Sequence, residues 1–301
     1  KQAAASIGQI KLINAFLKTF SDEGLKISQI LLNPKDTENR RTHLNARATL
    51  HTLLRHNIIP VINENDTTAT DEIRFGDNDK LAARVTQMME ADLLLILSTT
   101  DGLYTDNPQE NPDAEHIPVV EEISKDVLSV AQEVTSGVST GGMKSKIEAA
   151  QIALNSGTHV VITSGKENQP ISNLLSGNQK STLLCAQDTP YNARKRWIAA
   201  HIKPKGKLYI DLGAEKALKA GKSLLPVGVK RMEGSFERGD AVEILSLEKA
   251  SLAMGLVTYS SDEAKKIIGK NSDEFESALG YVGRDVLIHR NDMVLRDTEK
   301  V

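Results

Sequence analysis

Two runs of polar residues in this sequence have the types and spacing that suit the binding of a small charged molecule. Positions 63–66 hold Asn, Glu, Asn and Asp, and positions 76–79 hold Gly, Asp, Asn and Asp. Such side chains accept hydrogen bonds from an ammonium group, and their amides donate to a carboxylate. In the alternative interpretation they only satisfy loop backbone groups and cap a helix. Because these runs exceed what a turn or a cap needs, we favour a site for an amino acid.

A third cluster lies at residues 139–146, where two glycines and two lysines open a predicted helix. Glycines let the backbone approach a phosphate, the N–H groups of a helix N-terminus attract anions, and a lysine one turn further on neutralises charge during transfer. The spacing differs from that of the Gly-x-x-x-x-Gly-Lys-Ser/Thr loop, and a flexible loop without a ligand fits it equally well. Residues 98–104 follow an apolar run and add the hydroxyl groups of Ser98 and Thr99, which suit a nucleotide.

Together the three clusters suit phosphoryl transfer to a carboxylate. The attacking carboxylate is already ionised, so the reaction needs no strong general base. It depends on in-line positioning and on neutralisation of phosphate charge by lysines, backbone N–H groups and Mg²⁺. The seven histidines show no metal-ligand spacing, so we expect no metal site made by the protein. Cys185, the one cysteine, lies in an apolar run and is predicted to be a buried thiol rather than a nucleophile.

The elements that must position these clusters alternate between strands and helices from residue 1 to about residue 187. The predicted helices cover residues 1–20, 43–56, 79–90 and 143–156, and the predicted strands cover residues 26–32, 58–63, 92–97 and 159–163. The strand segments are almost entirely apolar, as in a parallel sheet with helices on both faces. This alternation predicts an α/β domain with three layers. Ligands of open α/β sheets bind beyond the carboxyl ends of the strands, where the polar clusters fall.

The pattern changes after residue 191, where a basic segment at 192–197 precedes a linker-like segment at 203–206. Short predicted strands follow at residues 207–211, 228–232, 241–246, 251–259 and 285–289, with two short helices at 214–220 and 261–268. This spacing predicts a small β-barrel-like module. We place the boundary at residues 200–204, which gives domains at 1–200 and 204–301.

The bulk composition is that of a globular protein, with 40% of the 301 residues hydrophobic and 26% charged. No apolar run approaches the ~20 residues of a membrane span, and a net charge of −3 does not favour a polyanion-binding protein. The single cysteine excludes an intrachain disulfide and fits a reducing cytosol. The chain opens without Met, inside an apolar helical pattern from Ile7 to Phe20, so we expect that a segment precedes it.

The order and spacing of these motifs resemble those of the bacterial glutamate 5-kinases, which belong to the amino acid kinase family. The resemblance rests on residues 61–66, 76–79, 102–105, 140–146 and 192–197, and it covers essentially the whole chain. Residues 221–226 and 238–240 are similar to the PUA domain that many bacterial members carry at the C-terminus. The resemblance implies an αβα sandwich of the amino-acid-kinase type, incomplete at its N-terminus, followed by a β-barrel-like PUA domain.

The resemblance also implies a cytoplasmic enzyme that uses ATP and Mg²⁺ to phosphorylate the side-chain carboxylate of L-glutamate, the first step of proline biosynthesis. By motif, Asp66 and Asn78 bind glutamate, Lys146 stabilises the moving phosphoryl group and Asp79 orients catalytic lysines. The implied ATP contacts are Ser98, Thr99, Thr140, Gly141, Gly142, Met143, Lys144, Ser145 and Lys146. Proline as feedback inhibitor, a homo-oligomer, and the glutamyl phosphate reductase of the next step as a partner are implied as well.

Two departures from the family pattern bear on activity. Members often carry aspartate where Thr99 stands, and the family's first strand, with its phosphate-gripping lysine and glycine-rich turn and a substrate-binding serine beyond the next strand, would precede Lys1. One alternative is therefore a kinase fold that binds ligand without catalysis. Another is an RNA-binding protein that uses the PUA domain and the basic residues of 194–196. Because acids and bases alternate in the tail from Lys203, we do not expect RNA to be the primary ligand.

Overall fold

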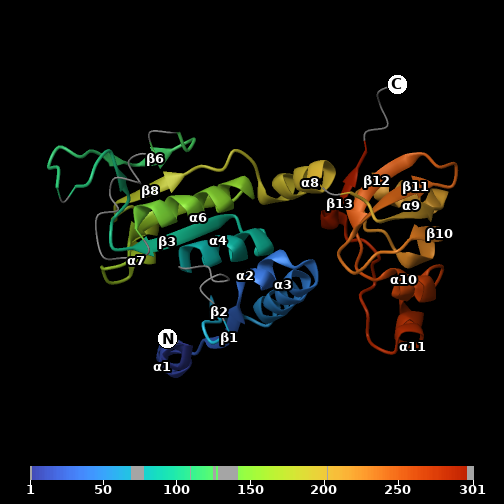
Figure 1. Cartoon of the computed structure of the whole chain (residues 1–301), viewed down its shortest axis with the longest axis horizontal. Coiled ribbons are helices and arrows are strands. Elements are labelled where there is room, and N and C mark those ends of the chain that lie inside the picture. Colours follow the sequence, from blue (N-terminus) through green and yellow to red (C-terminus); the bar gives the residue numbers. More distant parts are fainter. Residues whose placement is uncertain are drawn as a thin grey trace. The chain divides into compact units, whose positions relative to one another are not determined.

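The computed structural model describes residues 2–68, 78–108, 110–124, 127, 142–201 and 203–296. The chain divides into two compact units, Lys1–Pro190 and Tyr191–Val301, whose elements are labelled in Figure 1. Each unit contains its own buried apolar clusters. The predicted domain bounds, 1–200 and 204–301, stay predictions about which parts of the chain fold by themselves.

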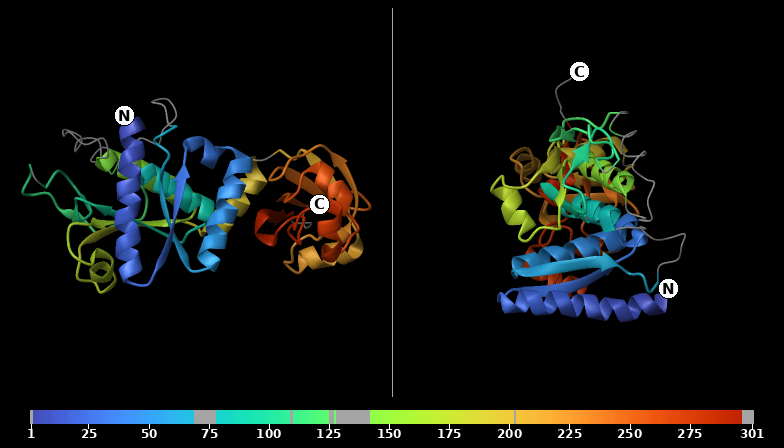
Figure 2. Two further views of the ribbon diagram at one scale, coloured as in Figure 1. Left: turned by 90° about the horizontal axis from the view of Figure 1, so that it is seen from below. Right: turned by 90° about the vertical axis from the view of Figure 1, so that its left-hand side faces the viewer.

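The first unit begins with a two-stranded sheet between helices. β1 (Lys26–Leu32) and β2 (Ile58–Glu64) pair in parallel along their whole length. α1 (Gln2–Asp22) lies on one face of this sheet and α3 (Arg40–Arg55) on the other, as the right-hand view of Figure 2 shows. The short helix α2 (Pro34–Glu38) connects β1 to α3. These elements confirm the predicted helix at 1–20 and the strands at 26–32 and 58–63.

α3 begins three residues before the sequence pattern predicts. Asn39 caps the helix, because its side-chain oxygen accepts hydrogen bonds from the backbone N–H groups of Arg41 and Thr42. The apolar side chains of α1 remain largely outside the core, since none of its described residues is buried. Its apolar residues that are exposed are Ile7, Ile10, Leu12, Phe16 and Leu17.

A second sheet of the first unit has four strands in the order β3-β7-β8-β6. β3 (Leu93–Ser98) and β7 (His159–Ser164) are parallel, and β8 (Ser181–Leu184) is antiparallel to β7 and parallel to β6 (Val119–Val120). A separate hairpin joins β4 (Leu103–Tyr104) to β5 (His116–Ile117). The predicted parallel arrangement is therefore confirmed for β3 and β7, whereas β8, at a segment where no strand was predicted, is antiparallel to β7. A short apolar run carries no information on strand direction, which non-local pairing decides.

Two helices that pack on the second sheet run side by side. α4 (Asn78–Met89) leads into β3 and α6 (Met143–Asn155) leads into β7 (Figure 1). Because β3 and β7 are parallel, both helices begin at the carboxyl edge of these strands. Their buried faces join one apolar cluster with the strands, to which Ala83, Ile147 and Ile162 belong. A further short helix, α7 (Pro170–Leu175), follows β7.

α4 also lies between the two sheets. A cavity of about 340 Å³ is lined by residues of β2, α4 and β3. Its lining residues are Pro60, Ile62, Asn78, Leu81, Ala82, Val85, Thr86 and Leu94. Most of these side chains are apolar, and Asn78 brings the polar start of α4 to the cavity. The first polar cluster, at the end of β2, and the second, at the start of α4, therefore belong to elements on either side of this cavity.

The second unit is built on a five-stranded sheet in the order β10-β9-β11-β12-β13. Its strands are β9 (Gly206–Ile210), β10 (Val229–Gly234), β11 (Ala241–Ser246), β12 (Ser251–Leu256) and β13 (Met293–Leu295). β9 and β11 are parallel, and the other neighbouring pairs are antiparallel. Its helices are α8 (Pro190–His201), α9 (Leu212–Lys219), α10 (Ser261–Ile267) and α11 (Phe275–Leu279), with 3₁₀ turns at Pro226–Gly228, Ser272–Glu274 and Arg290–Asp292. The predicted helices at 214–220 and 261–268 are confirmed.

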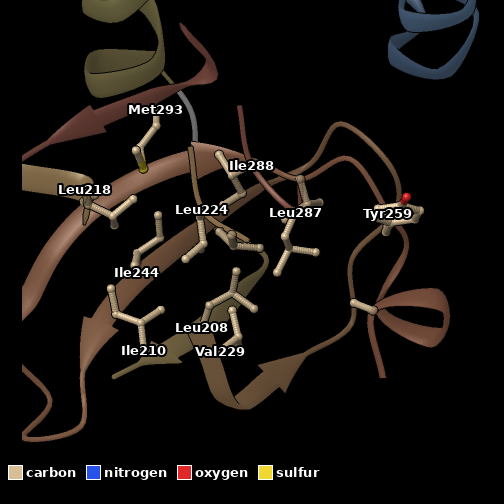
Figure 3. Packing of buried hydrophobic residues seen from close by; sticks show 14 of the residues in the cluster. Leu208, Ile210, Leu218, Leu224, Val229, Ile244, Tyr259, Leu287, Ile288 and Met293 are labelled. Atoms are coloured by element: carbon tan, nitrogen blue, oxygen red, sulfur yellow. The ribbon is translucent and has the colours of Figure 1, made fainter. Parts of the chain in front are cut away.

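The predicted strand at 285–289 is wrong. This segment forms one isolated bridge, between Ile288 and Leu224, and the fifth strand of the sheet lies further on. Leu287 and Ile288 are nevertheless fully buried, so the apolar pattern marks core residues rather than a strand. Figure 3 shows both side chains among those of the sheet, with Leu208 and Val229 nearby.

α8 packs against the sheet of the second unit. Ile198 is fully buried in a cluster with Ala241, Met254 and Leu256. Arg194 of the same helix donates to Asp292, with 2.6 Å between Nη2 and Oδ1. This apolar contact and this ion pair hold α8 against the core of the second unit.

Candidate active site

The predicted phosphate loop ends at the first turn of α6. Gly142 is the N-cap residue, and the backbone N–H groups of Ser145 and Lys146 donate to its carbonyl oxygen. Its φ of −65° and ψ of −176° are open to any residue, so backbone strain does not explain the glycine. Thr140 and Gly141 lie outside the described residues. The N–H groups of Met143 and Lys144 precede those of Ser145 and Lys146 and have no carbonyl partner within the helix, so they are placed to donate to an anion.

The side chains of this turn have different environments. Lys144 is exposed, whereas Ser145 is buried and Met143 packs against the apolar cluster of the first unit. Of the predicted ATP contacts at 143–145, Lys144 therefore has the most accessible side chain.

Lys146 forms an ion pair with Asp79 across the two helices. Its Nζ lies 2.9 Å from Oδ2 of Asp79, and the exposed fractions of the two side chains are 12% and 21%. A pair so far removed from water interacts more strongly than one on an open surface. The cluster at 76–79 and the cluster at 139–146 thus meet at one point, the shared start of α4 and α6. Asp77 and Gly76 lie outside the described residues.

The cluster at the end of β2 is partly used by the protein itself. Asn63 donates from Nδ2 to Oε1 of Gln9 on α1 at 2.8 Å, and Asn65 accepts from the hydroxyl of Thr67. Glu64 is buried at the end of the strand. Asp66, in contrast, is exposed in the turn that follows. Both asparagine side chains thus bond to other side chains, one of them on a distant helix, and not to loop backbone groups as in the alternative interpretation. The Asp66 carboxylate is the exposed member of this cluster.

Ser98 and Thr99 lie at the carboxyl end of β3. Ser98 is half-buried, its hydroxyl lies 3.4 Å from that of Thr100, and Thr99 is exposed. The backbone N–H of Gly165, just beyond β7, donates to the carbonyl oxygen of Ser98 at 2.8 Å. The two residues are thus on the same edge of the sheet as the starts of α4 and α6.

The segment beyond Ser98 is held by close contacts. A Cβ on Gly102, whose φ is +151°, would lie 2.6 Å from Oγ1 of Thr182 and 2.7 Å from Nε2 of His116. The hydroxyl of Tyr104 donates to Oδ1 of Asp101 at 2.9 Å, and burial together with this carboxylate raises the pKa of Tyr104. A larger residue at position 102 would displace the hairpin, so the motif at 102–105 has a structural reason as well as a predicted functional one.

Possible metal ligands do not gather in the part of the chain that the structure describes. Within the described ranges, no group of three or more His, Cys, Asp or Glu side chains is placed to bind a metal ion. Cys185, predicted to be buried, is half-buried and free. No helix in the part of the chain that the structure describes is long and apolar enough to cross a membrane.

Comparisons with known proteins agree with this architecture. The sequence profile of the amino acid kinase family matches residues 1–164, and that of the PUA domain matches residues 206–279. The first unit is thus an amino acid kinase fold, and a PUA domain follows it. Among solved structures, carbamate kinase from Giardia lamblia bound to AMP-PNP is 16% identical and covers 62% of this chain and 72% of that one, with a TM-score of 0.43.

Closer relatives define the family more narrowly. Glutamate 5-kinase of Bartonella henselae is 51% identical over 295 residues, which are 98% of this chain and 78% of that protein. Glutamate 5-kinase of Brucella ovis is 50% identical over 295 residues, which are again 98% of this chain and 78% of that protein. The chain belongs to the glutamate 5-kinase family. The resemblance that the motifs indicate is therefore confirmed, together with the fold class.

Proposed function

We propose that this enzyme transfers the γ-phosphoryl group of ATP to the side-chain carboxylate of L-glutamate at the shared start of α4 and α6. Membership of the glutamate 5-kinase family supports the reaction and both substrates. The ion pair between Lys146 and Asp79 supports this location of the site, because it joins two predicted clusters from distant parts of the chain. The product is L-glutamyl 5-phosphate.

Lys146 is proposed to neutralise charge on the moving phosphoryl group. A glutamate carboxylate oxygen forms a bond to the γ-phosphorus while the bond from that phosphorus to the β–γ bridging oxygen breaks and ADP leaves. Asp79 holds the Lys146 ammonium at the start of α6, so the cation need not be reoriented during the reaction. A preorganised donor of this kind contributes roughly 10²–10³ in rate.

ATP is proposed to lie against the N-terminus of α6 and the end of β3. The N–H groups at the very start of the helix would donate to phosphate oxygens there, and Gly142 adds no side chain beside them. Ser98 and Thr99 add hydroxyl groups from the neighbouring strand, and Lys144 adds an exposed ammonium. The remaining predicted contacts, Thr140 and Gly141, precede Gly142 in the chain.

Mg²⁺ is proposed to accompany ATP rather than to occupy a site made by the protein. Mg²⁺ usually keeps several waters and binds through substrate phosphates with one or two carboxylates. When bound, the ion would neutralise phosphate charge together with Lys146.

Glutamate is proposed to bind between the end of β2 and the start of α4. Asp66 is exposed after β2 and offers a carboxylate to the substrate ammonium, and Asn78 lines the cavity at the start of α4 and offers an amide to the substrate α-carboxylate. Proline carries the same α-carboxylate beside a charged amine, which supports our proposal that it inhibits by competing for these groups.

Further partners follow from the same proposal. The exposed apolar residues of α1 support a homo-oligomer, since soluble monomers rarely leave such side chains uncovered together. Acyl phosphates are reactive, which supports transfer of the product to the reductase of the next step. The single free cysteine supports a location in the cytoplasm.

RNA binding has less support as the primary role. Among the described residues of the second unit, seven cations form ion pairs with acids of that unit, which reduces any positive field available to a polyanion. These pairs are Arg194–Asp292, Lys205–Asp240, Lys219–Glu215, Lys230–Asp211, Arg231–Glu233, Lys265–Asp262 and Arg296–Glu243.

The test is formation of glutamyl hydroxamate by the purified protein with ATP, Mg²⁺ and hydroxylamine. We expect hydroxamate that depends on L-glutamate and is not formed with L-aspartate in its place. ATP turnover without dependence on glutamate would refute the proposal. Binding of both substrates without hydroxamate would instead support a kinase fold that only binds ligand. A gel shift with structured RNA that persists at high salt would favour the RNA-binding alternative.

A further inference from the structure

A second ion pair joins α4 to α6 beside the proposed catalytic one. Nζ of Lys80 lies 2.8 Å from Oε2 of Glu148, next to the 2.9 Å contact of Asp79 with Lys146. We propose that Lys80 and Glu148 are positioning residues, which fix how α4 lies against α6 and thereby where the Lys146 ammonium stands. The proposal rests on the role of Lys146 in the proposed function and extends that role to two residues that do not touch the substrates.

The order of charges allows one alignment of the two helices. α4 carries an acid followed by a base, Asp79 and Lys80, and α6 carries a base followed by an acid, Lys146 and Glu148. Each charge meets its opposite in the observed arrangement. An arrangement that brought Lys80 to Lys146 would place two cations together and leave both acids without these partners. Like charges at such separations repel, so the paired charges select one register and one rotation.

The small residues that both helices contribute to the apolar cluster are poorly suited to select a register. Ala83 of α4 and Ala149, Ala150 and Ala153 of α6 are fully buried in the same cluster. Small side chains let helices approach closely, but they make shallow ridges that interdigitate little. The two ion pairs at the helix starts therefore fix the register of α4 against α6, which the buried alanines determine only weakly. At the other end of α4, Glu90, the residue that follows the helix, forms an ion pair with Arg47 of α3.

The exposure of this second pair predicts a functional effect larger than its effect on stability. The side chains of Lys80 and Glu148 are 36% and 39% exposed, and ion pairs at such positions contribute little to folding. Reaction rates are more sensitive, because displacement of a reacting group by about 1 Å lowers a rate by as much as ~10²-fold. Loss of the pair should therefore move Lys146 enough to slow transfer while the protein stays folded.

The experiment reverses the pair, one charge at a time and then together. The variants are Lys80→Glu, Glu148→Lys and the double variant, assayed by hydroxamate formation beside Lys146→Ala. We expect each single reversal to lower kcat by roughly five- to tenfold, with the KM for glutamate changed less than twofold. The double variant should recover kcat to within about twofold of the original, since it restores an ion pair of opposite polarity. Glu148→Gln, which removes the charge without reversing it, replaces Glu148→Lys if that variant does not fold.

A matched control lies in the second unit, where Lys219 and Glu215 of α9 form an ion pair of the same length, 2.8 Å. Lys219→Glu should leave kcat unchanged. The positioning role would be overturned if single reversals of Lys80 or Glu148 kept the original kcat, or if they changed only the KM for glutamate. It would also be overturned if the loss of kcat in the double variant equalled the product of the two single losses. If Lys146→Ala keeps its turnover, the proposed function of Lys146 fails and the positioning role falls with it. If Lys146→Ala is inactive and the reversals are not, only the positioning role fails.

Discussion

Asp79 forms an ion pair with the ammonium group of Lys146, and we propose that its charge affects the reaction without contact with the phosphoryl group. Asp79→Asn keeps the shape of the side chain but removes the charge that faces Nζ of Lys146. We expect kcat for hydroxamate formation to fall about tenfold or more, because a less firmly held cation stabilises the transition state less well. The KM for ATP should change little. An unchanged kcat would show that Lys146 keeps its place without this carboxylate.

Asp66 and Asn78 are proposed to hold the part of glutamate that does not react. Such contacts are similar in the ground state and the transition state, so their loss acts on KM rather than on kcat. Asp66→Ala and Asn78→Ala should each raise the KM for glutamate by roughly tenfold, the effect of one lost charge-assisted hydrogen bond. Steady-state kinetics with each substrate varied in turn is the measurement. Equal increases in the KM for ATP would show that the two halves of the site are assigned wrongly.

The single residues of the site were partly predictable from the sequence. Lys146 and Asp79 stand out by type and by their place at helix starts, and the family resemblance implies that Asp79 orients lysines. The pair formed by Lys80 and Glu148 was not predicted, because both residues look like ordinary surface charges until α4 and α6 are packed together. The local bonds of Asn63 and Asn65 were also not assigned, since their partners depend on the positions of α1 and the turn.

At the scale of elements, α10 shows how a carboxylate fixes a helix start. Glu263 accepts hydrogen bonds from the backbone N–H of Ser260 at 2.9 Å and from the hydroxyl of Tyr281 at 2.7 Å. Burial, and after it this bond to Glu263, raises the pKa of Tyr281 to about 12. The folded state thus favours the neutral phenol. Its contribution to stability is complete below the ordinary tyrosine pKa of about 10 and is lost as the pH rises towards about 12.

Tyr281→Phe tests this titration. Spectroscopic titration of the tyrosines should show one group fewer ionising near pH 12 in the variant than in the original protein. The variant should also lose up to about 1 kcal/mol of unfolding free energy at neutral pH, since the side chain is partly exposed and its hydrogen bond is correspondingly weakened. The same alkaline titration in both proteins would contradict the assignment.

Helices were predicted better than sheets. α6 begins at Met143 and β2 begins at Ile58, as the sequence predicts. Both starts were predictable because periodicity and a glycine or turn at a boundary are local features of the sequence. The division into two sheets and the direction of β8 depend on pairing between distant segments. β13 was missed for a related reason: it has three residues, and the more apolar segment at 285–289 is core without being a strand.

At the scale of the whole molecule, α8 decides where the second unit can be cut. A fragment that begins at residue 190 keeps the buried Ile198 and the ion pair of Arg194 with Asp292, whereas one that begins at residue 204 loses both. Burial of one isoleucine contributes about 2 kcal/mol, so we expect the longer fragment to be more stable by at least about that amount. Urea unfolding of the two fragments is the measurement. Equal unfolding free energies would show that α8 is not part of this folding unit.

Lys146, at the start of α6, is proposed to stabilise the phosphoryl group as glutamate is phosphorylated. The most direct test of this role is the kcat of Lys146→Ala in the glutamyl hydroxamate assay, with the KM for glutamate measured in the same experiment. We predict a loss in kcat of roughly 10²–10³, the effect of one well-placed donor in the transition state, with a KM within about threefold of the original. A kcat close to that of the original protein would show that Lys146 does not stabilise the transition state.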